Sequence, residues 1–231
     1  MLVLLTGVGR PGQVGEAVAR AFAVNGASVL LVDRTYDNVR ARADELARDG
    51  HLATAYACDL ADAHAVEELA NRVRVDHGPT LDALVLLAGG FAVSGPIEAS
   101  SVEDWERQFT INLRTAYLAV RSFLPMVRLA KGTVIFFASA AALPGAKVAG
   151  TAAYAAAKVG VITLMQSVAQ QEGGTGVRAN ALAPVTIRTA TNVEAMGDQV
   201  KYVEREDVAG IVTFLCSDAA RSISGQIIRL E

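Results

Sequence analysis

Thr6-Gly-Val-Gly-Arg-Pro-Gly-Gln-Val-Gly15 lies between an apolar run at 2–6 and a helical pattern that begins directly after it. Gly7, Gly9 and Gly12 spell G-x-G-x-x-G, and a strand before the motif and a helix after it raise it above chance. Glycines let the backbone approach a pyrophosphate, while the helix N-terminus offers N–H donors and the positive end of its dipole. The stretch therefore predicts a dinucleotide site, with contacts from Gly7, Gly9, Arg10, Gly12, Val14 and Gly15.

An acidic residue follows at the distance that this motif requires. Asp33 lies 21 residues after Gly12, at the end of the second apolar run. A carboxylate there can accept hydrogen bonds from the adenosine ribose and would repel a 2′-phosphate. Arg34 comes next and could pair with that phosphate instead. The sequence thus favours NAD as the cofactor and leaves NADP open.

Apolar runs alternate with helical patterns along the whole chain. Runs such as Val29–Val32 are apolar throughout rather than alternating, which is typical of strands buried on both faces of a parallel sheet. This pattern predicts a single α/β domain over 1–231, a Rossmann-type doubly wound parallel sheet of about seven strands flanked by helices. Segment 186–203 lacks strong periodicity and is predicted to be a mobile loop or lid. The predicted strands are 2–6, 28–32, 52–57, 82–87, 133–138, 177–182 and 226–230, and the predicted helices are 13–25, 36–49, 62–77, 102–129, 151–171 and 205–217.

Composition narrows the function classes. The 231 residues are 52% hydrophobic and 19% charged, with a net charge of −3 and no basic run, which argues against nucleic-acid binding. Cys58 and Cys216 have no metal or redox spacing, and no cluster of His, Cys and Asp has ligand spacing, so no metal site is predicted. The apolar stretch 133–157 is broken by proline, glycine and lysine, so no membrane span is predicted either. Nothing marks the chain for export, and we expect a cytoplasmic protein.

Tyr154 and Lys158 carry the clearest chemical signal. They lie four residues apart in an Ala-rich segment, so both project from one face of a predicted helix. A phenol, with a pKa of about 10, is a poor acid or base at neutral pH. A lysine ammonium one turn away would stabilise the phenolate and lower that pKa. The pair suits proton transfer to and from a carbonyl or alcohol oxygen.

With these residues in place, the chain resembles the short-chain dehydrogenase/reductase family over essentially its whole length. Phe137-Ala-Ser139 resembles the strand end that carries the family's serine, and Ile111-Asn112 lies where the family has its active-site asparagine. Other motifs resemble the family's cofactor contacts. The resemblance implies a catalytic set of Asn112, Ser139, Tyr154 and Lys158, and further cofactor contacts at Asp59, Leu60, Ala88, Gly89, Gly90, Pro184, Ile187 and Thr189.

The resemblance also implies roles and assembly. Tyr154 would be the general acid or base, Lys158 would also hold the nicotinamide ribose, and Ser139 would donate a hydrogen bond to the substrate oxygen. Asn112 would distort its helix and hold a water that relays protons to Lys158. The family usually pairs two long helices across a two-fold axis, and 102–129 and 151–171 have Ala-rich faces, so we expect a homodimer or homotetramer.

The chain departs from the family's pattern at several positions. Its glycine loop is longer, as in the enoyl-reductase branch, but that branch places its tyrosine further from the lysine, and Ala152 lies six residues before Lys158. Enoyl reduction is therefore disfavoured. Leu87 replaces an asparagine that usually braces the sheet, so this polar bracing is expected to be absent. Val185 replaces a glycine next to the nicotinamide.

The favoured function is an NAD(P)-dependent oxidoreductase that interconverts a carbonyl and a secondary alcohol. A pterin- or quinone-type reductase of the same family and a non-catalytic dinucleotide-binding regulator are the alternatives. Phe91-Ala-Val93, the 143–150 loop and 186–203 are the expected walls of a pocket for a small-molecule substrate. Arg188 gives a weak indication of an anionic or acyl-carrier substrate, which surface solvation explains equally well.

Overall fold

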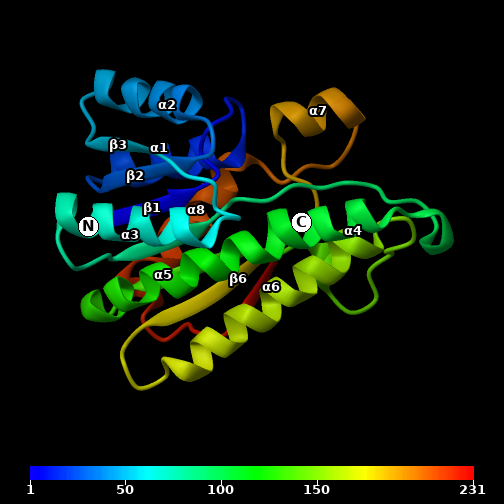
Figure 1. Ribbon diagram of the computed structural model, residues 1–231. Helices are drawn as coiled ribbons and strands as arrows, with labels where there is room; N and C mark the ends of the chain where they lie inside the picture. The colour runs from blue at the N-terminus through cyan, green and yellow to red at the C-terminus, as the bar shows by residue number, and fades with distance from the viewer.

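Seven parallel strands form one sheet in the order β3-β2-β1-β4-β5-β6-β7 (Figure 1). The computed structural model describes residues 1–231. Because β2 and β3 lie on one side of β1 while β4 lies on the other, the strand order reverses between β1 and β4, and ligands bind at this point in such sheets. The strands are β1 (Leu2–Thr6), β2 (Ser28–Asp33), β3 (Ala53–Ala57), β4 (Ala83–Leu86), β5 (Thr133–Phe137), β6 (Arg178–Pro184) and β7 (Ile227–Leu230).

Helices cover both faces of this sheet. Each strand sends alternate side chains to opposite sides, so Leu4 and Phe136 join one buried cluster while Leu5 and Ile135 join the other. The first cluster packs under α3 (Ala63–His77), α5 (Thr115–Ala130) and α6 (Ala152–Gln171). The second packs under α1 (Val14–Val24), α2 (Tyr36–Arg48) and α8 (Arg205–Leu215). The predicted fold class is confirmed.

The predicted helix 102–129 is wrong as one regular helix. The structure has α4 (Val102–Phe109), then a π-helical turn at Thr110–Arg114, and then α5. Asn112 lies inside this turn, so the helix is distorted where the resemblance implied. The other predicted strands and helices agree with the structure to within two residues at each end.

Segment 186–203 is more ordered than its sequence indicates. It contains α7 (Ala190–Met196), and its two ends pair through a parallel bridge between Ile187 and Val203. Thr189 caps the helix because its hydroxyl accepts a hydrogen bond from the Asn192 N–H at 3.2 Å. Figure 1 shows α7 standing above the sheet on the side of the carboxyl strand ends.

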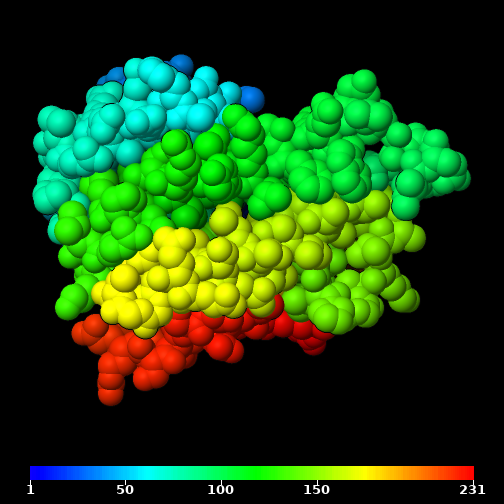
Figure 2. All heavy atoms as spheres, turned by 60° about the horizontal axis from the view of Figure 1, so that its bottom comes forward, coloured from blue at the N-terminus to red at the C-terminus, as the bar shows by residue number.

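By length and composition alone, α6 could cross a membrane, but 44% of its apolar window is buried inside the protein, as in a core helix. It lies along α5 on the face shown in Figure 2, where the two helices form neighbouring yellow and green ridges. This helix carries Lys158 into the interior and leaves Tyr154 partly buried.

Candidate active site

The glycine loop closes tightly over the ends of β1 and β4. Gly7 has φ +74°, and a Cβ at this position would lie 2.8 Å from the Cα of Ala88. Side chains rarely adopt such a φ, so only glycine fits here without strain. The backbone N–H of Ala88 also donates to the Thr6 hydroxyl at 3.2 Å. Leu87 is apolar as expected, but this hydroxyl supplies a polar connection between the two strand ends.

Asp33 faces the glycine loop. A Cβ on Gly9 would lie 2.5 Å from Cγ of Asp33, so the carboxylate occupies the space that a larger residue in the loop would fill. The carboxylate also accepts a hydrogen bond from the Thr35 N–H at 3.3 Å, which fixes its direction. Arg10 and Arg34 are exposed and make no ion pair. Of Asp33 and Arg34, only the Asp33 carboxylate is therefore held in place beside the expected position of the adenosine ribose.

The second half of the loop is held by α1 and α7. The Gly12 N–H donates to the Glu16 carboxylate at 2.6 Å, and the Gly12 carbonyl accepts from the Ala190 N–H at 2.9 Å. Gln13 donates to the Thr191 hydroxyl at 3.1 Å. These contacts join the dinucleotide loop to α7, although 178 residues separate Gln13 from Thr191. Glu16 was not predicted as a site residue, although its position in the first turn of the helix was the available signal.

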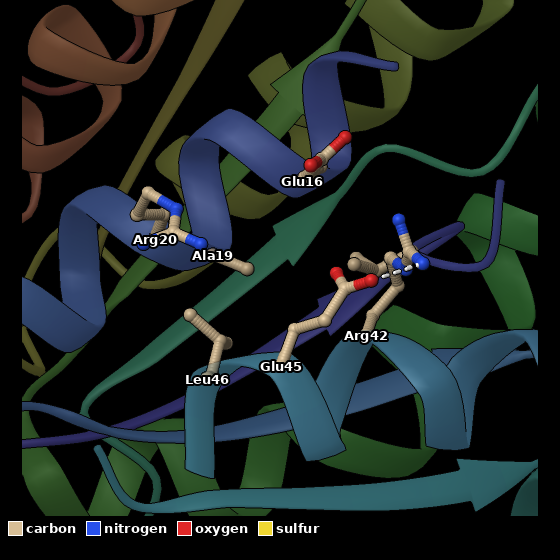
Figure 3. Close-up of a pocket in the computed structure, with 7 residues that line it drawn as sticks. Glu16, Ala19, Arg20, Arg42, Glu45 and Leu46 are labelled. Atoms are coloured by element: carbon tan, nitrogen blue, oxygen red, sulfur yellow. Dashed lines mark hydrogen bonds and ion pairs between the residues drawn. The ribbon is translucent and has the colours of Figure 1, made fainter. Parts of the chain in front are cut away.

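A small cavity lies behind this loop, between α1 and α2 (Figure 3). Its volume of about 10 Å³ is near that needed for one water. Arg42 pairs with Glu45 at 2.6 Å, while its Nε is buried without a partner. The cavity is too small for a substrate. Its lining residues are Val8, Glu16, Ala19, Arg20, Arg42, Glu45 and Leu46.

Lys158 is buried at the carboxyl end of β5. Its Nζ donates to the Phe137 carbonyl oxygen at 2.7 Å and lies 5.9 Å from the centroid of the Tyr154 ring. Burial lowers the pKa of Lys158 to about 8. The side chain therefore carries its charge at neutral pH, but at a cost in free energy.

Tyr154 and Ser139 meet beside this lysine. Burial raises the pKa of Tyr154, and the nearby Ser139 hydroxyl offsets part of that rise. The direction is opposite to the lowering expected from the lysine, because desolvation of the phenol is the larger effect. Ser139 is itself buried, and its hydroxyl accepts from the Ala141 N–H at 3.2 Å. The arrangement brings two hydroxyl groups and one ammonium group together at the ends of β5 and α6.

Asn112 clamps the loop after β4. Its amide exchanges two hydrogen bonds with the backbone of Gly90, each 3.0 Å long. A Cβ on Gly89 would lie 2.7 Å from the Asn112 Oδ1 and 3.4 Å from the Lys158 Nζ, so these two groups converge on Gly89. Gln108 was missed by sequence reasoning. Its side chain is buried, accepts from Asn112 at 3.1 Å and lies one turn before it, and that spacing was the available signal.

The remaining predicted contacts lie at neighbouring strand ends. Leu60 is buried after β3, and the Asp59 carboxylate accepts a backbone hydrogen bond from the Ala61 N–H at 2.9 Å. Pro184 ends β6, and Ile187 and Thr189 lie between it and α7. Val185 is 39% exposed at this point. No group of three or more His, Cys, Asp or Glu side chains is close enough together to hold a metal ion.

Arg188 is engaged within its own segment. It pairs with Asp198 at 3.0 Å and with Glu204 at 2.9 Å, and its guanidinium stacks over the Tyr202 ring at 4.7 Å. Two carboxylates therefore neutralise this cation. The indication of an anionic substrate drawn from Arg188 loses its support.

Comparisons with known proteins agree with this geometry. Residues 7–231 match a family model described as enoyl-(acyl carrier protein) reductase. The chain is 32% identical to D-threitol dehydrogenase of Mycolicibacterium smegmatis, covering 94% of this chain and 86% of the relative. It is 33% identical to meso-2,3-butanediol dehydrogenase of Serratia marcescens, covering 100% of this chain and 92% of the relative. The crystal structure of gox2181 superposes with a TM-score of 0.91 at 26% identity, covering 99% of this chain and 93% of the other.

The fold, the strand-end site and these relatives lead to one assignment. The chain belongs to the short-chain dehydrogenase/reductase family and is an NAD(P)-dependent oxidoreductase that interconverts carbonyl and alcohol groups.

Proposed function

We propose that Tyr154 exchanges the proton with the substrate oxygen, as the acid in reduction and the base in oxidation. The observation that carries this proposal is the meeting of Tyr154, Ser139 and Lys158 at the ends of β5 and α6. Ser139 donates a hydrogen bond to the oxygen as negative charge develops on it. Lys158 stabilises the phenolate, and Asn112 positions the Gly89-Gly90 backbone beside it and holds a water of the proton relay.

The cofactor site fits a nicotinamide dinucleotide, which would supply the hydride. The glycines at positions 7, 9 and 12 leave the loop backbone free of side chains at these positions, as the approach of a pyrophosphate requires. We infer that NAD is preferred, because Asp33 is fixed against Gly9 while Arg34 is free in solvent. The other proposed contacts are Arg10, Gly12, Val14, Gly15, Asp59, Leu60, Pro184, Ile187 and Thr189.

Three alternatives differ from carbonyl reduction in what they require. Enoyl reduction stays disfavoured, although the matching family model bears that description, because Tyr154 lies four residues before Lys158. A quinone- or pterin-type reductase would need Tyr154 and Lys158 but not Ser139. A non-catalytic regulator would bind the dinucleotide without any turnover that depends on Tyr154.

Nicotinamide absorbance during incubation with a panel of carbonyl compounds and secondary alcohols tests the proposal. NAD(H) and NADP(H) are supplied separately, and Tyr154→Phe and Ser139→Ala run beside the wild type. We expect turnover with NAD(H) that both substitutions reduce by at least about a hundredfold. Turnover that survives Ser139→Ala would favour the quinone or pterin reductase. Tight NADH binding with no turnover would favour the regulator.

We propose that the protein is a homodimer or homotetramer paired through α4, α5 and α6. The supporting feature is a surface depression of about 420 Å³ between these helices. Tyr117 within it is 50% exposed and Trp105 nearby on α4 is 44% exposed, which is unusual for large aromatic side chains of a monomer. The depression is lined by Phe109, Thr110, Leu113, Arg114, Tyr117 and Leu164.

Both cysteines are free thiols, in keeping with a reducing, cytoplasmic location.

A further inference from the structure

Phe91 is an exposed aromatic side chain in contact with Tyr154. The two rings meet edge to face, with centroids 5.1 Å apart and planes at 84°. Phe91 nevertheless remains 64% exposed, so most of its surface is open beside the tyrosine. A molecule whose oxygen reached the Tyr154 hydroxyl would lie next to this ring.

The segment that carries Phe91 is fixed at both ends. On one side, Asn112 binds both backbone groups of Gly90. On the other, the Gly150 carbonyl accepts from the Ser94 N–H at 2.7 Å, from the Gly95 N–H at 3.2 Å and from the Ser94 hydroxyl at 3.2 Å. The segment 91–95 is therefore clasped to the loop that leads into α6. Phe91 belongs to a preformed wall rather than to a free loop.

This wall offers mainly apolar contact. Segments 91–95 and 140–154 contain one charged residue, Lys147, whose side chain is exposed. The Ser94 hydroxyl is used in the clasp, and the Thr151 hydroxyl donates to the Val148 carbonyl at 3.1 Å. Val93 is 68% exposed, so it extends the apolar surface next to Phe91.

Three polar groups of segment 186–203 are already paired within the segment. The Asn192 amide donates to the Ile187 carbonyl at 2.8 Å, and the Tyr202 hydroxyl donates to the Gly197 carbonyl at 2.6 Å. Arg188 is neutralised by Asp198 and Glu204. Met196, at the end of α7, is 45% exposed. A second hydroxyl on a substrate would find Asn192, Tyr202 and Arg188 already paired.

We propose that the substrate is an uncharged ketone or secondary alcohol with an apolar ring or chain next to the reacting carbon, and that Phe91 selects it by packing against that group. This proposal rests on the role of Tyr154 proposed above. It separates the chain from its relatives named for D-threitol and meso-2,3-butanediol, since an added hydroxyl would lose its water without gaining a partner.

Steady-state oxidation of 1-phenylethanol, cyclohexanol, D-threitol and meso-2,3-butanediol with NAD tests the proposal. We expect kcat/KM for 1-phenylethanol to exceed that for D-threitol by at least about tenfold. Phe91→Ala should raise KM for 1-phenylethanol by about tenfold with little change in kcat, and should raise KM for meso-2,3-butanediol much less. Phe91→Leu should restore most of the loss. Val75→Ala, at an exposed position on α3, is the matched control.

Three outcomes would overturn the proposal. Preference of the wild type for D-threitol would show that the wall does not select apolar groups. An equal loss on every substrate in Phe91→Ala would mean that the ring positions Tyr154 instead of reading the substrate. In both cases turnover persists and the proposed role of Tyr154 stands. Absence of turnover on 1-phenylethanol and cyclohexanol would overturn this proposal alone, because Tyr154→Phe on the wider carbonyl panel tests the role of Tyr154 separately.

Discussion

The Nζ of Lys158 donates a hydrogen bond to the carbonyl oxygen of Phe137 at 2.7 Å, which ties α6 to the end of β5. Burial lowers the pKa of this lysine to about 8. Below pH 8 the lysine is therefore charged in the folded protein, where that charge costs more free energy than it does in the unfolded chain. This position serves the proposed chemistry at the expense of stability.

We predict that Lys158→Met abolishes turnover and yet stabilises the fold at pH 7 by about 1–3 kcal/mol. The gain should shrink between pH 8 and about 10.5, because the lysine of the wild type becomes neutral first in the folded state and then in the unfolded state. Urea unfolding at pH 7 and pH 10 measures both effects. Lys201→Met, at an exposed position, should change neither. A less stable Lys158→Met protein at pH 7 would contradict the prediction.

The raised pKa of Tyr154 predicts opposite pH dependences for the two directions of reaction. Oxidation needs the phenolate, so its kcat/KM should climb with pH through the neutral range. Reduction needs the phenol, which persists at neutral pH, and its rate should fall only above about pH 8, where Lys158 loses its charge. Initial rates from pH 6 to 10 in both directions provide the measurement, with Tyr36→Phe, which alters an exposed tyrosine, as the control. A flat oxidation profile would rule out Tyr154 as the base.

The sheet could be predicted from sequence because continuous apolar runs record burial on both faces, and the strand boundaries fell within two residues. The π-helical turn at Thr110–Arg114 could not be predicted from the sequence. A change from i→i+4 to i→i+5 bonding leaves little trace in hydrophobic periodicity. The seven-residue helix α7 was also missed, because the contacts that hold it, such as the bond between Ala190 and Gly12, come from distant parts of the chain.

The candidate site, too, could be predicted from the sequence only in part. Tyr154 and Lys158 could be paired from sequence because helical geometry alone places residues four apart on one face. The rise in the pKa of Tyr154 depends on its burial by parts of the fold that are distant in the sequence. The neutralisation of Arg188 likewise depends on where Asp198 and Glu204 return to it after α7. Local spacing reveals candidate groups, while their charge state is set by tertiary contacts.

Glu172 should make the fold sensitive to acid. Its buried carboxylate binds the guanidinium of Arg128, with an Nε–Oε2 distance of 2.8 Å, and this pair holds the pKa of Glu172 at about 2. Because the folded pKa is depressed, the stabilisation is complete above the unfolded value of about 4.5 and is lost as the pH falls towards 2. We predict that Glu172→Gln lowers stability by about 2 kcal/mol at pH 7 and by much less at pH 3.

Thermal or urea unfolding of Glu172→Gln across this pH range checks the prediction. Glu67→Gln is the matched control, since Glu67 is exposed on α3 and makes no ion pair. An equal loss of stability at pH 7 and pH 3 would show that the effect comes from packing rather than from the charge of the carboxylate.

Gly9 is the position at which cofactor affinity should be most sensitive to a single methyl group. In Gly9→Ala the new Cβ would lie 2.5 Å from Cγ of Asp33, so the carboxylate must rotate away from the loop. Folding should be little affected, because the displaced group is the end of one side chain. The proposed hydrogen bonds to the adenosine ribose should be lost, and we expect NADH to bind about tenfold more weakly. Because the repulsion of a 2′-phosphate weakens at the same time, the preference for NADH over NADPH should narrow.

Fluorescence titration with both dinucleotides measures the two effects, and Gly210→Ala, where a Cβ meets nothing within 4 Å, is the control. Unchanged NADH affinity in Gly9→Ala would mean that Asp33 does not hold the ribose, and the basis for preferring NAD would be lost.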